Sequence, residues 1–421
     1  MKPPNNNTPP QGYRMTELGA LPEEWEVVSF ESCIIKKNFK AKKIKQQDYK
    51  PYGKYPVIDQ GQNMIAGYWD NKNEVFGENL PVIIFGDHTR IIKYIDFPFV
   101  PGADGTRILI PNISFISPKF FYYSLLNLKI PSRGYNRHFS LLREQKIPLP
   151  PLAEQQKIAA VLSAVQEAKE KTEAVIAAAK ALKKSMMKHL FTYGPVSPEE
   201  VENIQLKETE IGPVPEDWEV VKLGDTFEFS KKPRNLKIKK DDFVPFIPME
   251  MISETNKSIK SWEEKRNSEI SSSSFVFRND IIIAKITPSF ENGKQAILDN
   301  LPTDFGYATT EIWALHPAKN VKAITYYLHY YLKINSIRKI LAGKMEGSTG
   351  RQRLPKHVLE NLPIPLPPLP TQQKIASILS AIDAKIEAEE NKKKALEELF
   401  KSLLHNLMTA KIRVNHLEII S

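Results

Sequence analysis

The sequence predicts an α+β fold with a pseudo-twofold internal repeat: two α/β domains separated by two long helices that pack as an antiparallel coiled coil. The segment TELGALPEEWEVV at 16–28 returns as TEIGPVPEDWEVV at 209–221, with nine of thirteen positions identical. A second segment at 147–165 returns at 364–382. The stretches between these segments share no obvious sequence, so one frame is expected to hold two different domains.

The repeat divides the chain into consecutive parts. Its 421 residues suit two to three domains at about 150 residues each. The opening tail at 1–12 is rich in proline and asparagine and carries little to bury, so we expect it to be disordered. The other parts are a first domain at 13–148, its helix at 149–192, a polar linker at 193–208, a second domain at 209–365 and its helix at 366–412.

Both helices follow a copy of LPPL, at 149–152 and 366–369. Proline lacks an amide proton and pushes its predecessor out of the helical region, so LPPL ends the preceding structure. Apolar residues then recur every three or four positions, which predicts a coiled-coil seam that a lone helix cannot cover. The residues expected in the seam are Ile158, Val161, Val165, Val175 and Leu182 in the first helix and Ile375, Ile378, Ile382, Leu396, Leu399 and Leu403 in the second.

The two dissimilar middles mix strand and helix patterns. β-rich runs occur at 81–85 and 280–286, and helical patterns at 118–128 and 323–341. They lack the regular strand–helix alternation of dinucleotide-binding folds, so both are predicted to be α+β domains.

The charge of the chain favours a polyanionic partner. Lys+Arg 59 exceed Asp+Glu 49, which leaves a net charge of +10 and a pI near 9.2. Runs at 36–45 and 231–240 each place six basic residues at an equivalent point after a repeated tryptophan. Such runs are often simply solvated, but the paired placement favours phosphate contacts. The residues expected to make them are Lys36, Lys37, Lys42, Lys43, Lys231, Lys232 and Arg234.

Reading bases requires other side chains: arginine for guanine, asparagine or glutamine for adenine, and serine or threonine as adaptable partners. These residues gather beside glycines in loops at 85–90, 104–107, 132–138, 284–294 and 347–353. The same loops equally suit ordinary turns, so both interpretations stay open for each. The expected contacts are His88, Thr89, Arg90, Arg107, Asn136, Arg137, Lys285, Thr287, Lys294, Ser348, Thr349, Arg351 and Arg353.

Enzyme signatures are missing from the sequence. It has no HExxH, no phosphate-binding GxxxxGK followed by Ser or Thr, and no glycine-rich dinucleotide turn, so we predict no catalytic residue, cofactor or metal. The single cysteine, Cys33, excludes an intramolecular disulfide. No apolar run approaches the roughly 20 residues of a membrane span, and we expect a cytoplasmic protein without membrane contact.

The paired IPLPPL…QQKI segments, the GxxPxxW segments at 19–25 and 212–218 and the dissimilar middles together resemble the specificity subunit of Type I restriction-modification enzymes. The likeness covers about residues 13–410, although Thr371 replaces the Glu154 of the first copy. It implies two target recognition domains, each reading half of a split double-stranded DNA site, with helices that set the gap. It also implies two methyltransferase subunits and ATP-dependent restriction and translocase subunits as partners, which would hold S-adenosylmethionine, ATP and Mg²⁺.

Two other functions stay open. A stand-alone DNA-modifying or DNA-cleaving enzyme would act on plasmid with Mg²⁺ and S-adenosylmethionine. A coiled-coil scaffold that binds only proteins would show no salt-dependent DNA binding in the presence of methyltransferase.

Overall fold

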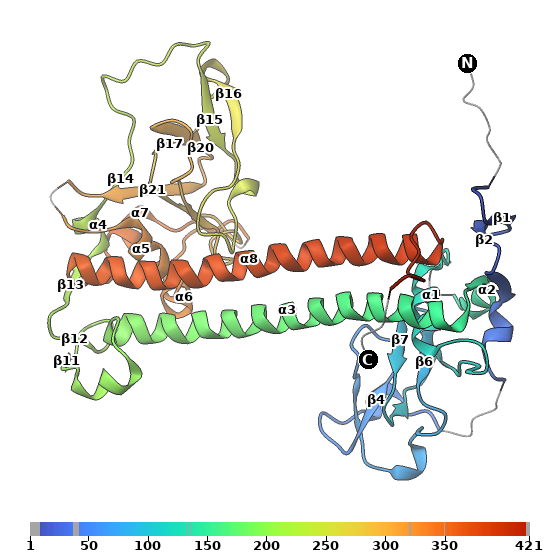
Figure 1. Cartoon of the computed structure of the whole chain (residues 1–421). Helices are drawn as coiled ribbons and strands as arrows, with labels where there is room; N and C mark the ends of the chain where they lie inside the picture. The colour runs from blue at the N-terminus through green and yellow to red at the C-terminus, as the bar shows by residue number, and fades with distance from the viewer. Residues whose placement is uncertain are drawn as a thin grey trace. The chain divides into compact units, whose positions relative to one another are not determined.

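The computed structural model describes residues 9–36, 42–132, 134, 136–319, 321–348 and 350–417. The chain forms two compact units, one of Met1–Glu173 with Asn391–Ser421 and one of Ala174–Glu390 (Figure 1). Each unit contains one α/β domain and part of both long helices. Most of the tail predicted to be disordered, at 1–8, lies outside the described residues, as do Lys37 and Thr349.

The domain of the first unit is built from short strands and two helices. These are β1 (Tyr13–Thr16), β2 (Gly19–Pro22), β3 (Glu26–Ser29), β4 (Tyr55–Ile58), β5 (Gly67–Trp69), β6 (Val82–Gly86), β7 (Ile92–Ile95), β8 (Val100–Pro101), β9 (Thr106–Leu109), β10 (Lys146–Leu149), α1 (Pro118–Asn127) and α2 (Phe139–Arg143). Two three-stranded sheets have the orders β5-β4-β8 and β7-β6-β9. All five residues of β6 are buried, which explains its continuous apolar sequence VIIFG. The β3–β10 pair joins the beginning of the domain to its end.

The domain of the second unit has two four-stranded sheets. Its elements are β11 (Leu206–Lys207), β12 (Val214–Pro215), β13 (Glu219–Lys222), β14 (Phe227–Phe229), β15 (Phe243–Ile247), β16 (Glu263–Arg266), β17 (Ser274–Phe277), β18 (Ile281–Ala284), β19 (Gln295–Ile297), β20 (Phe305–Ala308), β21 (Ile312–Pro317), β22 (Pro363–Leu366), α4 (Leu223–Thr226), α5 (Thr325–Leu332), α6 (Asn335–Ala342) and α7 (Lys356–Glu360). The sheet orders are β14-β21-β18-β19 and β16-β15-β20-β17. The β13–β22 pair repeats the β3–β10 closure of the first domain.

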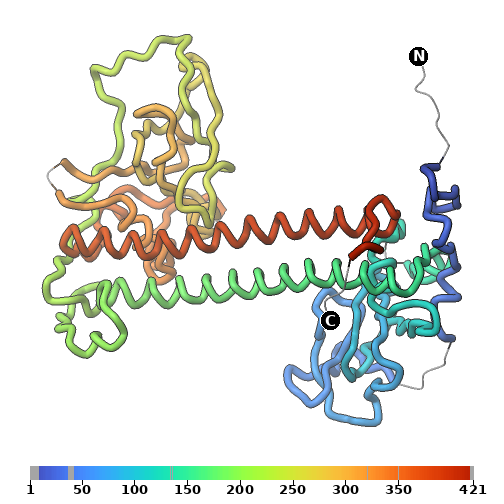
Figure 2. Tube along the Cα trace, viewed as in Figure 1, coloured from blue at the N-terminus to red at the C-terminus, as the bar shows by residue number. Residues whose placement is uncertain are grey.

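Two long antiparallel helices connect these parts. Helix α3 (Leu152–Tyr193) has 42 residues and α8 (Leu369–Met408) has 40, so each is about 60 Å long at about 1.5 Å per residue. Figure 2 traces both helices. The first unit contains the beginning of α3 and the end of α8. The second unit contains the end of α3 and the beginning of α8. Ion pairs occur between the helices in both units, from Lys393 to Glu173 and from Lys180 to Glu390. The predicted fold class is confirmed.

Part of the predicted seam is wrong. Val175, Leu182 and Leu399 have exposed fractions of 41%, 52% and 46%. Their neighbours Ile176, Lys183 and Phe400 take the inward positions instead. The shift is one residue at each position, because the adjacent side chain makes the inward contact: Ile176 and Phe400 are apolar, and Lys183 pairs with Asp383 of the other helix. The other predicted seam residues are buried or half-buried, namely Ile158, Val161, Val165, Ile375, Ile378, Ile382, Leu396 and Leu403.

A buried glutamine in the first turn of each long helix fastens it to its own domain. The Gln155 amide donates to Phe115 O at 3.0 Å and Pro150 O at 2.8 Å, and its Oε1 accepts from the backbone N–H of Ser117 at 2.8 Å. Gln372 makes the same three contacts in the second copy, with Lys322 O, Pro367 O and the backbone N–H of Ile324. The duplicated sequence QQK therefore fixes a duplicated attachment of helix to domain.

The far end of each long helix enters the core of the other domain. Leu190 and Phe191 of α3 belong to the core that contains Trp218, and Leu404 and Leu407 of α8 belong to the core that contains Trp25. Each core is therefore completed by a helix that begins in the other half of the chain.

One contact occurs in the first unit only. The indole N–H of Trp25 donates to Glu154 at 2.9 Å, and Arg413 donates to both oxygens of this 4% exposed carboxylate, at 2.7 and 2.9 Å. Thr371 stands at the equivalent position of the second copy and cannot make this ion pair.

Candidate nucleic-acid interface

Three predicted loops of the first domain meet at Asp87, which is 1% exposed. Its Oδ1 accepts hydrogen bonds from the backbone N–H groups of His138 at 2.9 Å and Phe139 at 2.8 Å. Its Oδ2 accepts from Nε and Nη2 of Arg107 at 3.1 and 3.0 Å. The Asp87 N–H donates to Gly105 O at 2.7 Å. One carboxylate thus joins the loops at 85–90, 104–107 and 132–138.

The charge of Asp87 is preserved in this setting. Burial alone would raise the pKa of Asp87, but hydrogen bonds from Phe139 and Arg107 outweigh it and hold the pKa below its usual value. Arg107 in turn lies 5.0 Å from the ring centroid of Phe139, and its side chain is 40% exposed. The guanidinium is therefore held at the surface in a fixed orientation, which suits recognition of a phosphate or of guanine.

Gln60, which the sequence did not single out, supports the same loops. Its Oε1 accepts from the backbone N–H of His88 at 3.1 Å, and its carbonyl accepts from the Thr89 hydroxyl at 2.7 Å. Gly105 has φ +73°, and a Cβ there would come within 2.7 Å of Gln60 Oε1. Glycine at 105 is therefore favoured by the left-handed backbone conformation, and a side chain there would also displace the end of Gln60.

A hollow of about 600 Å³ opens beside Gln60. Lys45, Gln46, Gln47 and Asp104 contribute to its lining. Glutamine amides pair with adenine and aspartate accepts from the cytosine amino group, so this lining is chemically suited to base edges. Lys45 and Asp104 lie within the predicted basic run and a predicted loop, whereas Gln46 and Gln47, which directly follow that run, were not predicted because no glycine lies beside them.

Two predicted cations of the first domain are used within the fold. Lys43 Nζ donates to Thr106 O at 2.7 Å, and burial, with the nearby charge of Arg107, lowers the pKa of Lys43. Arg90 Nη1 donates to Ile130 O at 2.9 Å. These side chains brace the loops as well as adding positive charge.

Other predicted residues of the first domain lie at the surface. Lys36 pairs with Glu31 at 2.9 Å, and Lys42 lies 4.0 Å from Glu74. Exposed ion pairs are weak, so an incoming phosphate can compete for these lysines. Asn136 and Arg137 are also exposed.

The two predicted loops of the second domain lie side by side. The backbone N–H of Thr287 donates to Gln352 O at 3.0 Å, and that of Leu354 donates to Lys285 O at 2.7 Å. The described parts of the loops at 284–294 and 347–353 therefore form one surface, although every residue of one loop is more than 50 positions from every residue of the other.

Three predicted cations of this surface have local partners. Arg353 donates from Nε and Nη2 to both oxygens of Glu311, at 2.9 and 2.8 Å, and this hydrogen bonding raises the pKa of Arg353. Lys285 Nζ lies 4.1 Å from the ring centroid of Trp313. Lys294 Nζ donates to a backbone carbonyl at 3.0 Å. These three charged groups are thus held in place by contacts within the domain.

The second basic run begins beside this surface. It follows β14, whose Phe229 packs edge-on against Trp313 with ring centroids 5.3 Å apart. Lys232 lies 6.0 Å from the ring centroid of Tyr307. Five further predicted contacts are exposed, namely Lys231, Lys232, Arg234, Ser348 and Arg351.

A buried acid of the second domain was also missed by sequence reasoning. Asp280 is 0% exposed, and its Oδ2 accepts from the Ser230 hydroxyl at 2.5 Å and from the Phe277 N–H at 2.8 Å. His316 Nδ1 lies 3.0 Å from the same hydroxyl and 3.7 Å from Oδ1. Oδ1 has no hydrogen-bond partner among the described residues, and burial raises the pKa of Asp280 to about 7.

This raised pKa predicts a pH-dependent stability. Between the ordinary value of 3.8 and about 7, the folded protein keeps a proton that the unfolded chain has released. The contribution of Asp280 to the free energy of unfolding should therefore fall as pH rises from 4 to 7, by up to about 4 kcal/mol, and level off above 7. Asp280→Asn should flatten this decline in urea unfolding measured at pH 5, 6, 7 and 8.

The exposed Asp304→Asn serves as the matched control and should keep the wild-type slope. His316→Gln separates the contribution of the neighbouring imidazole, and Glu228→Gln that of the carboxylate 3.8 Å from it. Equal slopes for wild type and Asp280→Asn would show that Asp280 does not titrate in this range.

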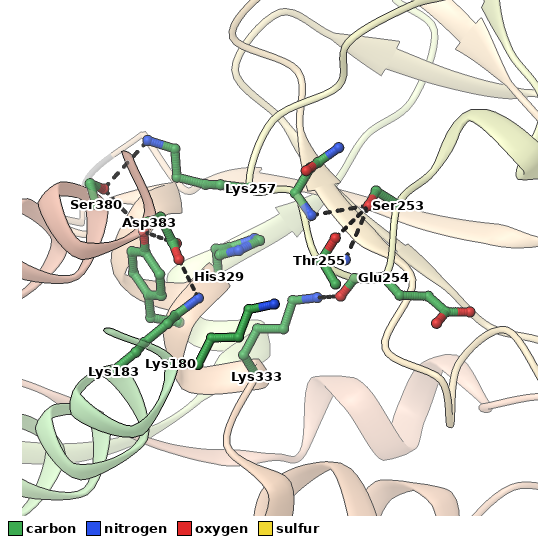
Figure 3. Close-up of polar contacts among 12 residues, drawn as sticks. Lys180, Lys183, Ser253, Glu254, Thr255, Lys257, His329, Lys333, Ser380 and Asp383 are labelled. Carbon is green, nitrogen blue, oxygen red and sulfur yellow. Dashed lines mark hydrogen bonds and ion pairs between the residues drawn. The ribbon is translucent and has the colours of Figure 1, made fainter. Parts of the chain in front are cut away.

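A hollow of about 470 Å³ in the second unit is rich in lysine (Figure 3). Lys183 pairs with Asp383 at 2.5 Å, and Lys333 Nζ donates to Glu254 O at 2.7 Å. Burial lowers the pKa of Lys333 to about 7. Glu387 and Glu390 also line the hollow and form ion pairs there, so its charges are largely balanced. It is therefore a weaker candidate for a polyanion than the loop surfaces.

Within the described ranges, no cluster of three or more His, Cys, Asp or Glu side chains is arranged to hold a metal. In that same part of the chain, no helix is long and apolar enough to cross a membrane.

Comparisons with known proteins agree on one family. Residues 22–180 and 215–398 each match the model of the Type I restriction modification DNA specificity domain. The MjaVIII specificity subunit of a type I restriction enzyme from Methanocaldococcus jannaschii is 28% identical over 429 residues, covering 94% of this chain and 95% of that protein. The EcoAI specificity subunit of Escherichia coli is 35% identical over 164 residues, covering 38% of this chain and 27% of that protein.

A solved structure has the same fold. The S subunit of a Type I restriction-modification system from M. genitalium superposes with a TM-score of 0.60 at 18% identity. The match covers 91% of this chain and 96% of that one.

Proposed function

Because the chain belongs to the family of Type I restriction modification DNA specificity domains, we propose that its two domains each read one half of an asymmetric, bipartite double-stranded DNA site. The observation that carries this proposal is the attachment of two unlike loop surfaces to one repeated frame. Asp87 organises the first surface, and the Thr287 contact with Gln352 joins the loops of the second. Gln155 and Gln372 fasten both domains to the long helices through equivalent contacts. Two different loop surfaces, each attached to the long helices in the same way, suit the reading of two different half-sites.

Within each surface, charge and base reading would be divided between residues. Exposed lysines such as Lys36, Lys42 and Lys231 would neutralise phosphates, while the fixed Arg107 and the glutamines around the first hollow would meet base edges. The long helices would set the number of unread base pairs between the half-sites.

The same proposal includes two methyltransferase subunits bound to the repeated frame and restriction and translocase subunits that join them. Val175 and Leu182 lie seven residues apart on α3, so their exposed apolar side chains share one face of that helix, which supports this docking. S-adenosylmethionine, ATP and Mg²⁺ would be held by those partners.

A domain exchange tests the proposal. The protein is produced in a host together with its methyltransferase, and the methylated motif is read by methylome sequencing. The wild type should give two short specific sequences separated by a fixed unspecified gap. Replacing residues 29–146 with the corresponding segment of another specificity subunit should change one half of the motif and leave the other half and the gap unchanged.

A change in both halves, or in neither, would contradict separate reading by the two domains. Deleting seven residues from each long helix should shorten the gap and keep both half-sequences. A changed half-sequence in that variant would contradict the role given to the helices.

A further inference from the structure

Arg338 of α6 is an unusual buried cation. It is 8% exposed, and no acidic side chain among the described residues pairs with it. Instead, Nη1 donates to Phe290 O at 2.7 Å, and Nη2 donates to Gln295 Oε1 at 2.6 Å and to Leu332 O at 2.9 Å. The guanidinium also lies 5.2 Å from the ring centroid of Phe290.

These contacts of Arg338 hold the loop at 287–293 on its buried side. The Phe290 ring is 2% exposed and belongs to the domain core. Gly293 has φ +88° and lies against the Arg338 guanidinium, and its carbonyl accepts from Lys333 Nζ at 2.8 Å. Lys333, in the turn that follows α5, and Arg338, in α6, therefore fix two backbone carbonyls of the same loop.

The opposite side of this loop faces solvent. Pro288, Glu291 and Asn292 are exposed. The Glu291 carboxylate accepts from the Thr287 hydroxyl at 3.0 Å, whereas the side-chain amide of Asn292 makes no hydrogen bond within the described residues. An asparagine amide can pair with both N6 and N7 of adenine in the major groove, provided that its backbone is held still.

The charge of Arg338 is costly to bury, because a guanidinium without an acidic partner loses its hydration and gains no ion pair in return. Burial lowers the pKa of Arg338 to about 10, so the side chain still carries its charge near neutral pH. What a long apolar side chain could not do is hold the Phe290 carbonyl and the Gln295 amide in fixed positions.

We infer that Arg338 is a positioning residue for base reading: it fixes the loop at 287–293 so that Asn292 can recognise an adenine in the half-site of the second domain. This inference rests on the proposed function, because it presumes that the domain at 209–365 reads one half-site. Asn292 is not among the base contacts expected from the sequence, and Arg338 is a buried residue that affects base reading only through Asn292.

The test uses the full protein produced with its methyltransferase, and methylome sequencing of the host as the readout. Asn292→Ala should reduce the preference for adenine about tenfold at one position of one half-site. Arg338→Met should relax the same position and leave the other half-site and the gap unchanged. The matched control is Lys339→Met, because Lys339 is the exposed neighbour of Arg338 on the same helix. It should leave the whole motif as in the wild type.

The outcomes distinguish a failure of the proposed function from a failure of the roles given to Asn292 and Arg338. A wild type that gives no split motif would remove the proposed function itself. A wild-type split motif that Asn292→Ala leaves intact would overturn the inference. If Arg338→Met does not fold, Asn292→Ala still decides the reading role, and Arg338→Lys decides the positioning role. The lysine keeps the charge but cannot reach all three acceptors, so a folded Arg338→Lys variant with an unrelaxed motif would overturn that role.

Discussion

Asp87→Ala is expected to abolish sequence discrimination by the first domain and to lower its stability by about 3 kcal/mol. The substitution leaves the N–H group of Phe139 without its acceptor, at a cost of about 1–3 kcal/mol, whereas the N–H of His138 keeps the backbone carbonyl of residue 87 at 2.8 Å. It also releases Arg107 from its fixed orientation. Thermal unfolding measures the first effect, and methylome sequencing with the methyltransferase measures the second.

Two variants sharpen this prediction. Asp96→Ala removes an exposed aspartate of the same domain and should change neither stability nor motif. Asp87→Asn keeps the shape but loses the charge, so it should retain part of the stability and still lose the preference set by Arg107. A folded Asp87→Ala variant with an unchanged motif would mean that the three loops do not depend on this carboxylate for their function.

The second large effect is expected at the two buried glutamines. Gln155→Ala and Gln372→Ala each remove three hydrogen bonds at the start of a long helix and leave backbone groups without partners. We expect a loss of about 3 kcal/mol from each. The glutamines belong to different units and share no partner, so the losses in the double variant should add to within about 0.5 kcal/mol.

The sequence supplies an internal control for this pair. Gln156 and Gln373 follow the buried glutamines directly and are exposed. Alanine at either position should cost a few tenths of a kcal/mol at most. Urea unfolding of the four single variants and the double variant measures these differences. Equal effects at the exposed and buried glutamines would contradict the attachment described above.

The frame was predictable because its signals are local. LPPL blocks, three/four spacing and a repeat at two offsets predicted the two domains and both long helices. The position of the seam was harder, since adjacent apolar residues such as Val175 and Ile176 fit either register. The choice between them depends on the facing helix, where Asp383 attracts Lys183.

The candidate surfaces were only partly predictable. Glycine and polar side chains indicated most of the loops, but not that Asp87 draws three of them together across gaps of 20 and 51 residues. Nor could spacing indicate that Lys43 and Arg90 brace backbone carbonyls. These are long-range contacts that depend on how the sheets place distant turns next to each other.

The C-terminal Arg413 has a consequence for how the protein is made. The second unit is one continuous stretch of chain, at 174–390, and can fold as soon as it leaves the ribosome. The first unit emerges earlier, yet Glu154 must wait 259 residues for Arg413, and its core must wait for Leu404 and Leu407. The domain that is translated first is therefore the last to complete its hydrophobic core. A nascent chain released before residue 404 would leave that core incomplete.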